Sequence, residues 1–380
     1  MKICYIMKYP PWDKRAWGGE DHIFNIALEV SKNKNEVTII NSSYEGYKYG
    51  ICWKKVSFIA WDRLRHSFLI PKKKDLFFFF NSSSFDIVHY YDICGFPVER
   101  MKSNFNFRTV FSRFSDPISA KGYKNKFDFL IHLKLFFFIG FYIEKYLAKK
   151  ANLFVTTSNN LRKFSKSNFN LNRTILKINR GVNISRFKFS KYPSNYNIFV
   201  ANRLDPEKNT FFVLKAMPKI IAVCPNAKLY IAGDGVEKKQ MIEFCKNNNL
   251  NKQVIFLGKI SSEKMIRYYK KCSVYINCSV CEGWGATVTE AMAIGRPIVA
   301  ARAGGYLEQV IHNYNGFLIK PTILNISKSL IFILNNKLIA KKMGLHSRKI
   351  VDAKLTFKIE SQHYVDNYKK IMLVEEHVEN

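Results

Sequence analysis

Residues 281–301 read CEGWGATVTEAMAIGRPIVAA and contain side chains that bear directly on chemistry. Glu282 and Glu290 lie on either side of a Gly-Trp-Gly turn, between an apolar run and a short apolar helix. Thr287 and Gly295 mark the expected start and end of that helix. A helix N-terminus presents unpaired backbone N–H groups, and nearby glycines let an anion approach them. The stretch therefore predicts a phosphate site flanked by two carboxylates, which suit sugar hydroxyls as hydrogen-bond acceptors.

A second set of charged side chains occurs in the segment RLDPEKN, which contains Arg203 and Lys208. Guanidinium and ammonium groups make charge-assisted bonds to phosphate oxygens and stabilise charge on a leaving group. Alternatively, the two cations form surface ion pairs with Asp205 and Glu207, which contribute little to stability. Glu290 has a similar alternative, because the helix dipole favours an acid in the first turn. Neither alternative explains why all these groups follow consecutive predicted strands.

The elements that must position these groups alternate between short β-branched or aromatic runs and helix-length segments. Such alternation is typical of βα units around parallel sheets. We expect a first series of strands at 2–7, 36–41, 86–91, 108–112 and 152–157. We expect a second series that begins near Tyr196 and continues at 227–233, 253–258, 273–278, 296–301 and 316–320. Ligands of such sheets bind outside the carboxyl ends of the strands, so the strand-to-helix loops are the expected site of chemistry.

The length of 380 residues favours two domains over one hydrophobic core. The polar, basic and proline-containing segment 186–197 is the expected linker. We therefore place an N-terminal domain at residues 1–190 and a C-terminal domain at 191–355. The remaining tail has a spacing of tyrosines that suits a helix over 357–372.

The chain is strongly basic, with 61 Lys and Arg against 29 Asp and Glu, a formal charge of +32. This balance favours an anionic partner, either nucleic acid, an acidic membrane surface or phosphorylated small molecules, although it also promotes solubility. The first twenty residues lack the pattern of a secretory signal, which favours an intracellular location.

The eight cysteines are scattered, which fits reduced thiols better than a disulfide framework. Cys278 and Cys281 form a CxxC, but no second pair of ligands accompanies them, so a zinc or redox site is the weaker interpretation. The apolar segment 129–143 is too short for a bilayer span and is interrupted by His132 and Lys134. We expect a core helix, with a basic surface on anionic lipid as the alternative.

The Glu282-x7-Glu290 arrangement, with EGWG and EAMAIGRPIVAA, resembles the signature of the retaining family 4 glycosyltransferases (glycosyl transferases group 1). Other segments agree with the family's order over essentially the whole chain: GGEDHIFNIALEV, DIVHYYD, VTTSNN, NRGVN, RLDPEKN, IAGDG, FLGKIS and AGGYLEQVI. The resemblance implies an α/β fold of the GT-B class, with two Rossmann-like, doubly wound parallel-sheet domains facing a cleft. It also implies that residues 356–380 include a helix that crosses back to the N-terminal domain.

The resemblance assigns roles to particular positions. Arg203 and Lys208 match the pair that contacts the donor diphosphate, Glu282 matches the residue that faces the donor sugar, and Glu290 matches the residue that holds the ribose hydroxyls. Further donor contacts are expected from Gly283, Trp284, Gly285, Ala286, Gly233 and Asp234. The phosphate and acceptor loop of the N-terminal domain is expected to include Gly18, Gly19, His89, Arg113 and Ser115. For the glycine pair a plain flexible turn is the alternative, and for His89 a structural role is at least as well supported.

The sequence departs from the family pattern after the strand RTVFS, where the family often has a histidine near the reacting sugar. This chain has RFSDP there. The acceptor-side base is therefore left open. No Asp-x-Asp pair occurs, and with Arg203 and Lys208 in place this favours chemistry that needs no metal or other cofactor.

The resemblance therefore implies a retaining hexosyltransferase that uses a UDP- or GDP-linked sugar donor, and we expect a glycan or lipid-linked acceptor. We expect a cytoplasmic protein, with peripheral attachment to the inner face of an anionic membrane as an added interaction. One alternative is a non-catalytic basic protein that binds nucleic acid or membrane, although nucleic acid is disfavoured because the charge is dispersed and no nucleic-acid motif is present. Another is a different enzyme of the same fold, such as a phosphorylase or a sugar-nucleotide epimerase.

Overall fold

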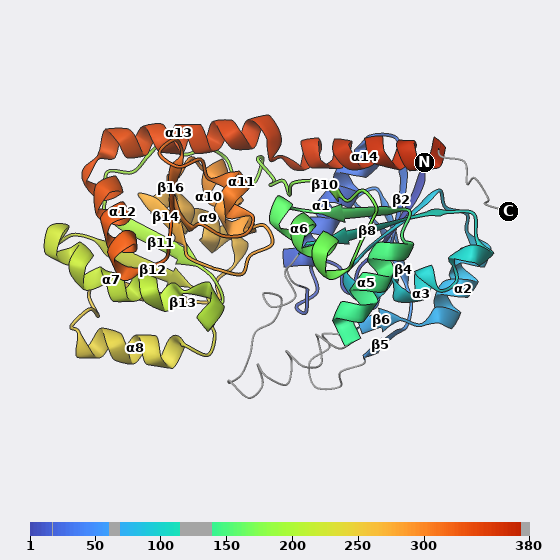
Figure 1. Cartoon of the computed structure of the whole chain (residues 1–380), viewed down its shortest axis with the longest axis horizontal. Coiled ribbons are helices and arrows are strands. Elements are labelled where there is room, and N and C mark those ends of the chain that lie inside the picture. The colour runs from blue at the N-terminus through green and yellow to red at the C-terminus, as the bar shows by residue number, and fades with distance from the viewer. Residues whose placement is uncertain (17, 61–68, 115–138, 374–380) are drawn as a thin grey trace. The chain divides into compact units, whose positions relative to one another are not determined.

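The structure is a computed structural model of the chain, and it describes residues 1–16, 18–60, 69–114 and 139–373 (Figure 1). Contacts divide these residues into two units, which we describe separately. Unit 2 comprises residues 180–356. Unit 1 comprises the described residues before 180 and those from 357 onward.

Unit 1 is built on an eight-stranded sheet with the order β10-β9-β8-β7-β1-β2-β4-β3. Its pairs are parallel except for the short antiparallel β3–β4 edge. A separate antiparallel pair, β5–β6, lies outside this sheet. The strands are β1 Lys2–Ile6, β2 Glu36–Asn41, β3 Gly46–Lys48, β4 Ile51–Lys55, β5 Phe58–Ala60, β6 Leu69–Pro71, β7 Ile87–Tyr91, β8 Arg108–Arg113, β9 Leu153–Thr156 and β10 Leu176–Lys177.

Helices cover both faces of this sheet. Successive residues of a strand point to opposite faces, so apolar residues along one strand contribute to two cores. Ile3 and Tyr5 of β1 pack in a core with α1 and α14, whereas Cys4 and Ile6 pack in a second core with α2, α3 and α5. The helices of unit 1 are α1 Gly18–Lys32, α2 Lys73–Ser82, η1 Asp92–Gly95, α3 Phe96–Glu99, η2 Lys102–Asn104, α5 Phe141–Lys150, α6 Asn159–Asn168 and α14 Phe357–Leu373.

Unit 2 has a six-stranded, fully parallel sheet with the order β13-β12-β11-β14-β15-β16. The strands are β11 Asn197–Ala201, β12 Lys228–Ala232, β13 Val254–Gly258, β14 Val274–Asn277, β15 Ile298–Ala301 and β16 Gly316–Ile319. Its helices are η4 Pro206–Lys208, α7 Thr210–Val223, α8 Lys238–Asn247, α9 Ser262–Lys271, α10 Ala286–Ala293, α11 Tyr306–Gln309, α12 Ile323–Asn335 and α13 Lys337–Lys354. One core joins the sheet to α7, α8 and α12, and the other joins it to α9, α10, α11 and α13.

The strand order reverses direction in both sheets, at β7–β1 in unit 1 and at β11–β14 in unit 2. In doubly wound sheets, ligands bind at such switch points, beyond the carboxyl ends of the strands. In unit 2 this places the loops after β11 and β14 next to each other. These are the loops in which the sequence predicts the chemistry.

The boundary between the units falls between Asn179 and Arg180, earlier than the expected boundary after residue 190. The reason is that the polar segment after 180 is packed onto unit 2. The N–H of Val182 donates to the carbonyl of Leu355 (2.9 Å), and the side chain of Phe187 is buried in the core around α10. Farther along, the buried Arg296 donates to the carbonyl of Ser190 at 2.8 Å.

The helix α14 belongs to unit 1 although it follows unit 2 in the sequence. Its tyrosines extend into the core of unit 1, where the hydroxyl of Tyr368 lies 3.2 Å from that of Tyr5, and the hydroxyl of Tyr364 lies 3.0 Å from Ser112 Oγ. A buried pair, His22 Nε2 and Glu360 Oε1 at 2.9 Å, joins α1 to α14. The last helix therefore supplies part of the core of the first unit.

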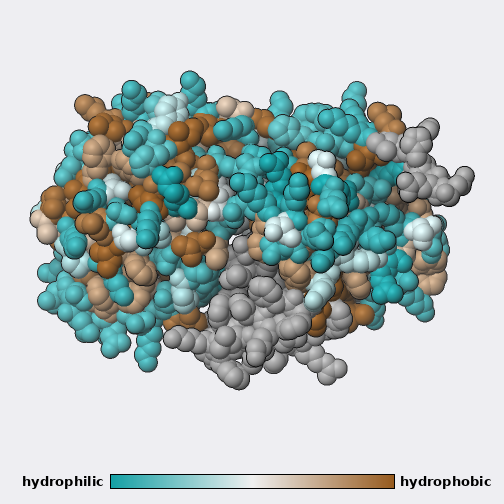
Figure 2. All heavy atoms as spheres, in the orientation of Figure 1, coloured by the Kyte–Doolittle hydropathy of each residue, from teal (hydrophilic) through white to brown (hydrophobic). Residues whose placement is uncertain are grey.

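Within the described residues, no single helix has the length and apolarity of a bilayer span. α12 and α13 reach that length and composition only together, and they are bent by 101° at the break between them. Part of the apolar segment 129–143 lies outside the described residues, and its end forms the start of α5. On the face seen in Figure 2, hydrophobic atoms occur in small separate patches among hydrophilic ones.

Candidate active site

The loop from Cys278 to Gly285 joins β14 to α10 and holds the first of the two predicted carboxylates. Gly285 is the residue before the helix, and its φ of +91° is in the left-handed region that favours glycine. A Cβ at this position would lie 2.4 Å from the ring of Tyr306. The glycine therefore lets the backbone turn tightly enough to aim the first N–H groups of α10 toward the loop.

Glu282 of this loop forms an ion pair with Lys208 of η4. Lys208 Nζ lies 3.1 Å from Glu282 Oε2, and the side chains are 8% and 21% exposed, respectively. Lys208 also donates to Ser279 Oγ at 3.4 Å. The structure thus brings together the two residues that sequence reasoning placed on the sugar and on the diphosphate, from the loops after β14 and β11.

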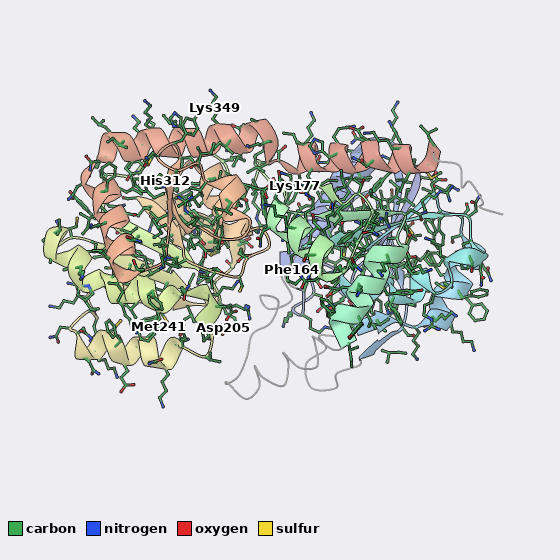
Figure 3. All side chains as sticks on the ribbon, viewed as in Figure 1. Phe164, Lys177, Asp205, Met241, His312 and Lys349 are labelled. Atoms are coloured by element: carbon green, nitrogen blue, oxygen red, sulfur yellow. The ribbon has the colours of Figure 1, made fainter. Side chains whose placement is uncertain are left out.

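Arg203 makes ion pairs within its own loop. Its guanidinium donates to Asp205 Oδ2 at 2.8 Å and to Glu207 Oε1 at 3.0 Å. Burial raises the pKa of both carboxyl groups, and the Arg203 charge opposes this shift. Asp205 lies in the loop that follows β11 (Figure 3). Arg203 thus forms the ion pairs that the alternative interpretation expects, whereas Lys208 pairs with Glu282.

Glu290 lies in α10 and is partly buried. Tyr269, at the C-terminal end of α9, donates a hydrogen bond from its hydroxyl to Glu290 Oε2 at 2.8 Å. The carboxylate is therefore held by a side chain that the sequence analysis did not identify.

Gly233 and Asp234 follow β12, the neighbour of β11. Gly233 has a φ of +130°, and a Cβ there would lie 1.7 Å from the carbonyl oxygen of Asn202, so this position requires glycine. Asp234 is exposed and accepts hydrogen bonds from the Gly235 N–H (3.0 Å) and from Lys238 Nζ (3.3 Å). Both positions therefore lie beside the loop of Arg203, as expected for a shared site.

Trp284 does not present its side chain to a ligand, which corrects the prediction of a donor contact for it. The side chain is 1% exposed, packs in the core around α10, and donates from Nε1 to Thr289 Oγ1 at 3.1 Å. Trp284, between two glycines, therefore anchors the loop to the core around α10. Ala286 is exposed at the start of α10, and Gly283 lies in the loop itself.

Gly18 and Gly19 are the first residues of α1 in the structure, not part of a free-standing loop. A Cβ at either position would meet no atom within 4 Å. Packing within the described residues therefore leaves open space at this helix N-terminus.

His89 is buried in unit 1 and does not face solvent. Its Nδ1 lies 2.6 Å from the hydroxyl of Tyr368, and its Nε2 lies 2.8 Å from Ser112 Oγ. Burial lowers its pKa well below the usual range, so the ring is neutral. The structural alternative is correct, and the assignment of His89 to the acceptor loop was wrong because both ring nitrogens are used inside the core.

Arg113 is also buried, which corrects its assignment to the acceptor loop. Its Nε donates to Glu144 Oε2 at 3.0 Å, and its guanidinium lies 5.0 Å from the ring of Phe164, which Figure 3 labels. A charge that is removed from water needs such a partner, so this pair holds α5 against β8. Ser115 lies outside the described residues.

The sequence analysis missed several residues that shape the site. Asn202 and Asn277 lie at the ends of neighbouring strands and exchange side-chain hydrogen bonds of 3.1 and 3.2 Å. Asn277 Oδ1 also accepts from the N–H of Ser279, which orients the start of the loop. The only sequence signal was an asparagine at each strand end, which is too common to single out.

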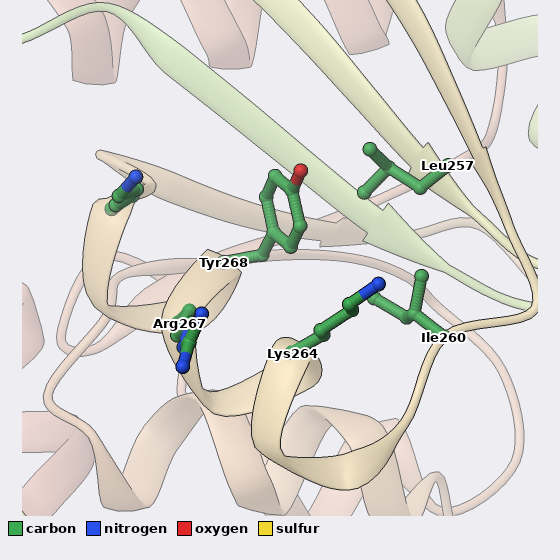
Figure 4. A pocket seen from close by; sticks show the side chains of 6 residues that line it. Leu257, Ile260, Lys264, Arg267 and Tyr268 are labelled. Atoms are coloured by element: carbon green, nitrogen blue, oxygen red, sulfur yellow. The ribbon is translucent and has the colours of Figure 1, made fainter.

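A hollow of about 260 Å³ lies elsewhere in unit 2, between α9 and β13 (Figure 4). It is lined by Leu257, Ile260, Lys264, Arg267, Tyr268 and Lys271. None of the predicted site residues lines it. Its three cations make it an exposed basic surface, separate from the charged groups around Lys208.

All eight cysteines lie in the described part of the chain as thiols, and Cys278 of the CxxC is buried. Residues 1–16, 18–60, 69–114 and 139–373 contain no cluster of His, Cys, Asp and Glu with the arrangement of a metal site.

The loops after β11, β12 and β14 therefore bring charged side chains, and backbone segments that contain glycine, to one end of the sheet of unit 2. The family model described as glycosyl transferases group 1 matches residues 182–350, which lie within this unit. Residues 182–350 belong to the glycosyl transferases group 1 family.

Relatives of known sequence match parts of the chain. An uncharacterized glycosyltransferase of Methanocaldococcus jannaschii is 35% identical over 33% of this chain and 32% of its own length. The alpha-monoglucosyldiacylglycerol synthase of Streptococcus pneumoniae is 33% identical over 29% of this chain and 25% of its own length. The matches thus span about a third of these relatives or less.

Solved structures match almost the whole chain. The sucrose-phosphate synthase of Thermosynechococcus elongatus has a TM-score of 0.77 at 17% identity, over 97% of this chain and 98% of its own. The Anabaena protein HepE, solved in complex with UDP, has a TM-score of 0.76 at 17% identity, over 97% of this chain and all of its own. These likenesses confirm the predicted GT-B fold, with a parallel α/β sheet in each unit.

Proposed function

We propose that this protein is a retaining glycosyltransferase that moves a hexose from a nucleoside-diphosphate sugar to an acceptor hydroxyl. The observation that carries the proposal is the Lys208–Glu282 ion pair beside the N-terminus of α10. The group 1 family of residues 182–350 supports it, because this segment contains every residue proposed to hold the donor.

The diphosphate of the donor would lie against the start of α10. The first N–H groups of that helix and the Lys208 ammonium would then share the negative charge that develops on the leaving group. Arg203 would add a second cation once a phosphate competes with Asp205 and Glu207 for its guanidinium. Because these two cations can carry the charge, we propose that transfer needs no metal ion or cofactor.

The sugar and the ribose would be held by the two glutamates. Glu282 would accept hydrogen bonds from hydroxyls of the transferred hexose while its carboxylate remains paired with Lys208. Glu290 would accept from the ribose hydroxyls. Because Glu282 is already engaged with Lys208, we propose direct attack of the acceptor on an oxocarbenium-like sugar from the face that the diphosphate leaves.

The donor is proposed to be a UDP- or GDP-sugar, and UDP has the support of the complex in which HepE was solved. Thermal-shift measurements with UDP-, GDP- and ADP-sugars test this, because a ligand that binds the folded state raises the unfolding temperature. NMR of the product linkage, with and without a metal chelator, then tests the mechanism. An inverted anomeric centre, or loss of activity with the chelator, would overturn the corresponding part of the proposal.

Two substitutions separate the roles of the glutamates. We expect Glu290→Ala to raise the KM for the donor with a smaller change in kcat, because the ribose is bound alike in the ground state and the transition state. We expect Glu282→Ala to lower mainly kcat. Steady-state kinetics with the selected donor measure both constants, and unchanged kinetics for either variant would remove that residue from the site.

The acceptor is proposed to be a glycan or a lipid-linked sugar, and the lipid product named for the Streptococcus relative supports the second. We propose that the protein works in the cytoplasm and that its positive charge adds contact with an anionic membrane surface. An enzyme of the phosphorylase or epimerase type would not show release of nucleoside diphosphate that depends on an added acceptor. That dependence is therefore the measurement that separates these activities.

A further inference from the structure

Glu290 accepts a hydrogen bond from a buried side chain, that of Tyr269. The hydroxyl of Tyr269 lies 2.8 Å from Glu290 Oε2, and Tyr269 is wholly buried. Tyr269 lies at the end of α9 and Glu290 in α10, so the bond crosses between two helices on one face of the sheet. A hydrogen bond from a fixed donor restricts the orientation of the carboxylate that accepts it.

The position of the Tyr269 ring is fixed by aromatic packing. Its centroid lies 5.2 Å from that of Phe199 on β11 and 5.4 Å from that of Tyr275 on β14, both at edge-on angles. The ring centroid of Phe187, which precedes β11 in the sequence, lies 6.3 Å from that of Tyr269. These distances are within the range of favourable aromatic pairs. The ring therefore has little room to rotate away from Glu290.

The protonation of Tyr269 also favours this role. Burial first, and the neighbouring Glu290 second, raise the pKa of its hydroxyl well above the usual range. The hydroxyl therefore stays protonated and acts as a donor. A buried hydroxyl without an acceptor would destabilise the folded protein. The hydrogen bond therefore stabilises Tyr269 as well as Glu290.

We infer that Tyr269 is a positioning residue, which holds the carboxylate of Glu290 in the orientation that accepts hydrogen bonds from the ribose hydroxyls of the donor. This inference rests on the proposed function. It predicts that the hydroxyl of Tyr269 contributes to donor binding although it is buried away from the ligand.

Tyr269→Phe tests the inference, because it removes the hydroxyl and keeps the ring. We expect the dissociation constant of UDP or GDP to rise by up to roughly 10- to 150-fold, the range that follows from losing one hydrogen bond to a charged group. At saturating donor, kcat should change less than about threefold, because the ribose is bound alike in the ground state and in the transition state.

The control is Tyr275→Phe. Tyr275 is equally buried and aromatic, but its hydroxyl donates to the carbonyl of Ala201 at 3.2 Å. A general weakening of this core would affect both variants, whereas a role through Glu290 affects Tyr269→Phe alone. Equal losses of affinity in the two variants would overturn the inference.

The 2′,3′-dideoxy forms of UDP and GDP separate positioning from unspecific damage. The wild type should bind these probes more weakly than UDP or GDP, because the hydroxyls that Glu290 accepts from are missing. Tyr269→Phe should weaken the dideoxy probes by less than twofold. If it weakens them as much as it weakens UDP and GDP, the hydroxyl does not act through the ribose and the inference fails.

A spectroscopic measurement keeps the inference testable if the proposed function fails. Tyr269 from α9 and Tyr275 from β14 are the titratable groups whose electrostatic contacts with Glu290 the structure gives. Removing the Tyr269 donor destabilises the ionised carboxylate, so the Glu290 pKa should rise in Tyr269→Phe, and by less in Tyr275→Phe, which removes a hydrogen bond to Ala201 instead. Carboxyl NMR titration measures it. Failure of the wild type to bind UDP or GDP would refute the proposed function, and an unchanged Glu290 pKa would refute the positioning.

Discussion

At the scale of single residues, the site is a set of charges that already have partners within the protein. Lys208 pairs with Glu282, and Arg203 pairs with Asp205 and Glu207. A phosphate that enters must compete with these carboxylates for the cations. Binding is therefore an exchange of partners, in which the N–H groups of α10 supply donors that no side chain has to release.

Lys208→Ala is expected to lower kcat/KM by roughly 10²- to 10³-fold, the loss typical for removing one group that stabilises transition-state charge. Steady-state kinetics measure the loss. The control is Lys54→Ala, which removes a cation from the exposed pair with Glu45 and should leave kcat/KM within about twofold. Equal losses in both variants would show that Lys208 acts only through overall charge.

The residue types of this site were predictable from the sequence, but their surroundings were not. Glu282 and Lys208 were assigned to one site and do meet. Trp284 and His89 were assigned to ligand contacts and are buried instead, each with its polar atoms paired inside the core. A sequence shows that a side chain can bind a ligand, whereas packing decides whether it faces one.

At the scale of elements, the loop after β15 supports the loop after β14. A Cβ on Gly304 would lie 1.9 Å from the carbonyl oxygen of Glu282, and the N–H of Gly305 donates to that same oxygen at 3.2 Å. Gln309 Nε2 donates to the carbonyl of Gly285 at 3.0 Å. The two loops are therefore packed against each other, and the position of Glu282 depends on both.

Gly304→Ala is expected to reduce kcat at least about tenfold, because the added methyl group displaces the backbone of Glu282 in a site where small displacements are costly. Kinetics at saturating donor measure it. Gly258→Ala is the matched control: Gly258 also has a positive φ, at +65°, but a Cβ there would meet no atom within 4 Å. If Gly258→Ala loses as much kcat, backbone strain explains the loss, not displacement of Glu282.

The helix α14 gives unit 1 a pH-dependent stability. His89, which α14 covers, has a pKa that burial lowers well below its ordinary value of 6.5. The unfolded chain therefore binds a proton below about pH 6.5 that the folded chain does not, so the free energy of unfolding should fall by up to about 1.4 kcal/mol per pH unit below that value. Denaturant unfolding between pH 5 and 8 measures the slope.

In His89→Gln this slope should become shallower, because the buried titrating group is gone. His363→Gln is the control, since His363 is exposed on the same helix. A slope that is unchanged in His89→Gln would assign the pH dependence to other groups.

The central strands of both sheets were predictable because each is a continuous apolar run, which is typical of a parallel strand buried on both faces. All expected strands are present close to their predicted bounds. The strands β3 to β6 were not predicted. β3, β5 and β6 are three-residue strands at the edge of the sheet or outside it, and a segment such as GYK has no periodicity that distinguishes it from a loop. β4 has five residues and lies between β2 and β3.

At the scale of the whole molecule, the charge of +32 is expected to produce binding to anionic surfaces that falls with salt. Sedimentation with phosphatidylglycerol vesicles should retain the protein at low ionic strength and lose most of it near 0.5 M salt, where the Debye length is about 4 Å. Phosphatidylcholine vesicles are the control. Retention on both lipids, or retention that salt does not reduce, would contradict an electrostatic contact.

The order in which the two units can form follows from α14. Tyr364 and Tyr368 complete the core of unit 1, yet the ribosome makes them after all of unit 2. Domains often fold in their order of synthesis, but here the earlier one must wait for its final layer. Unit 1 is therefore expected to lack the layer formed by α14 during the whole synthesis of unit 2, which exposes the apolar residues of β1, β7 and β8 that α14 later covers.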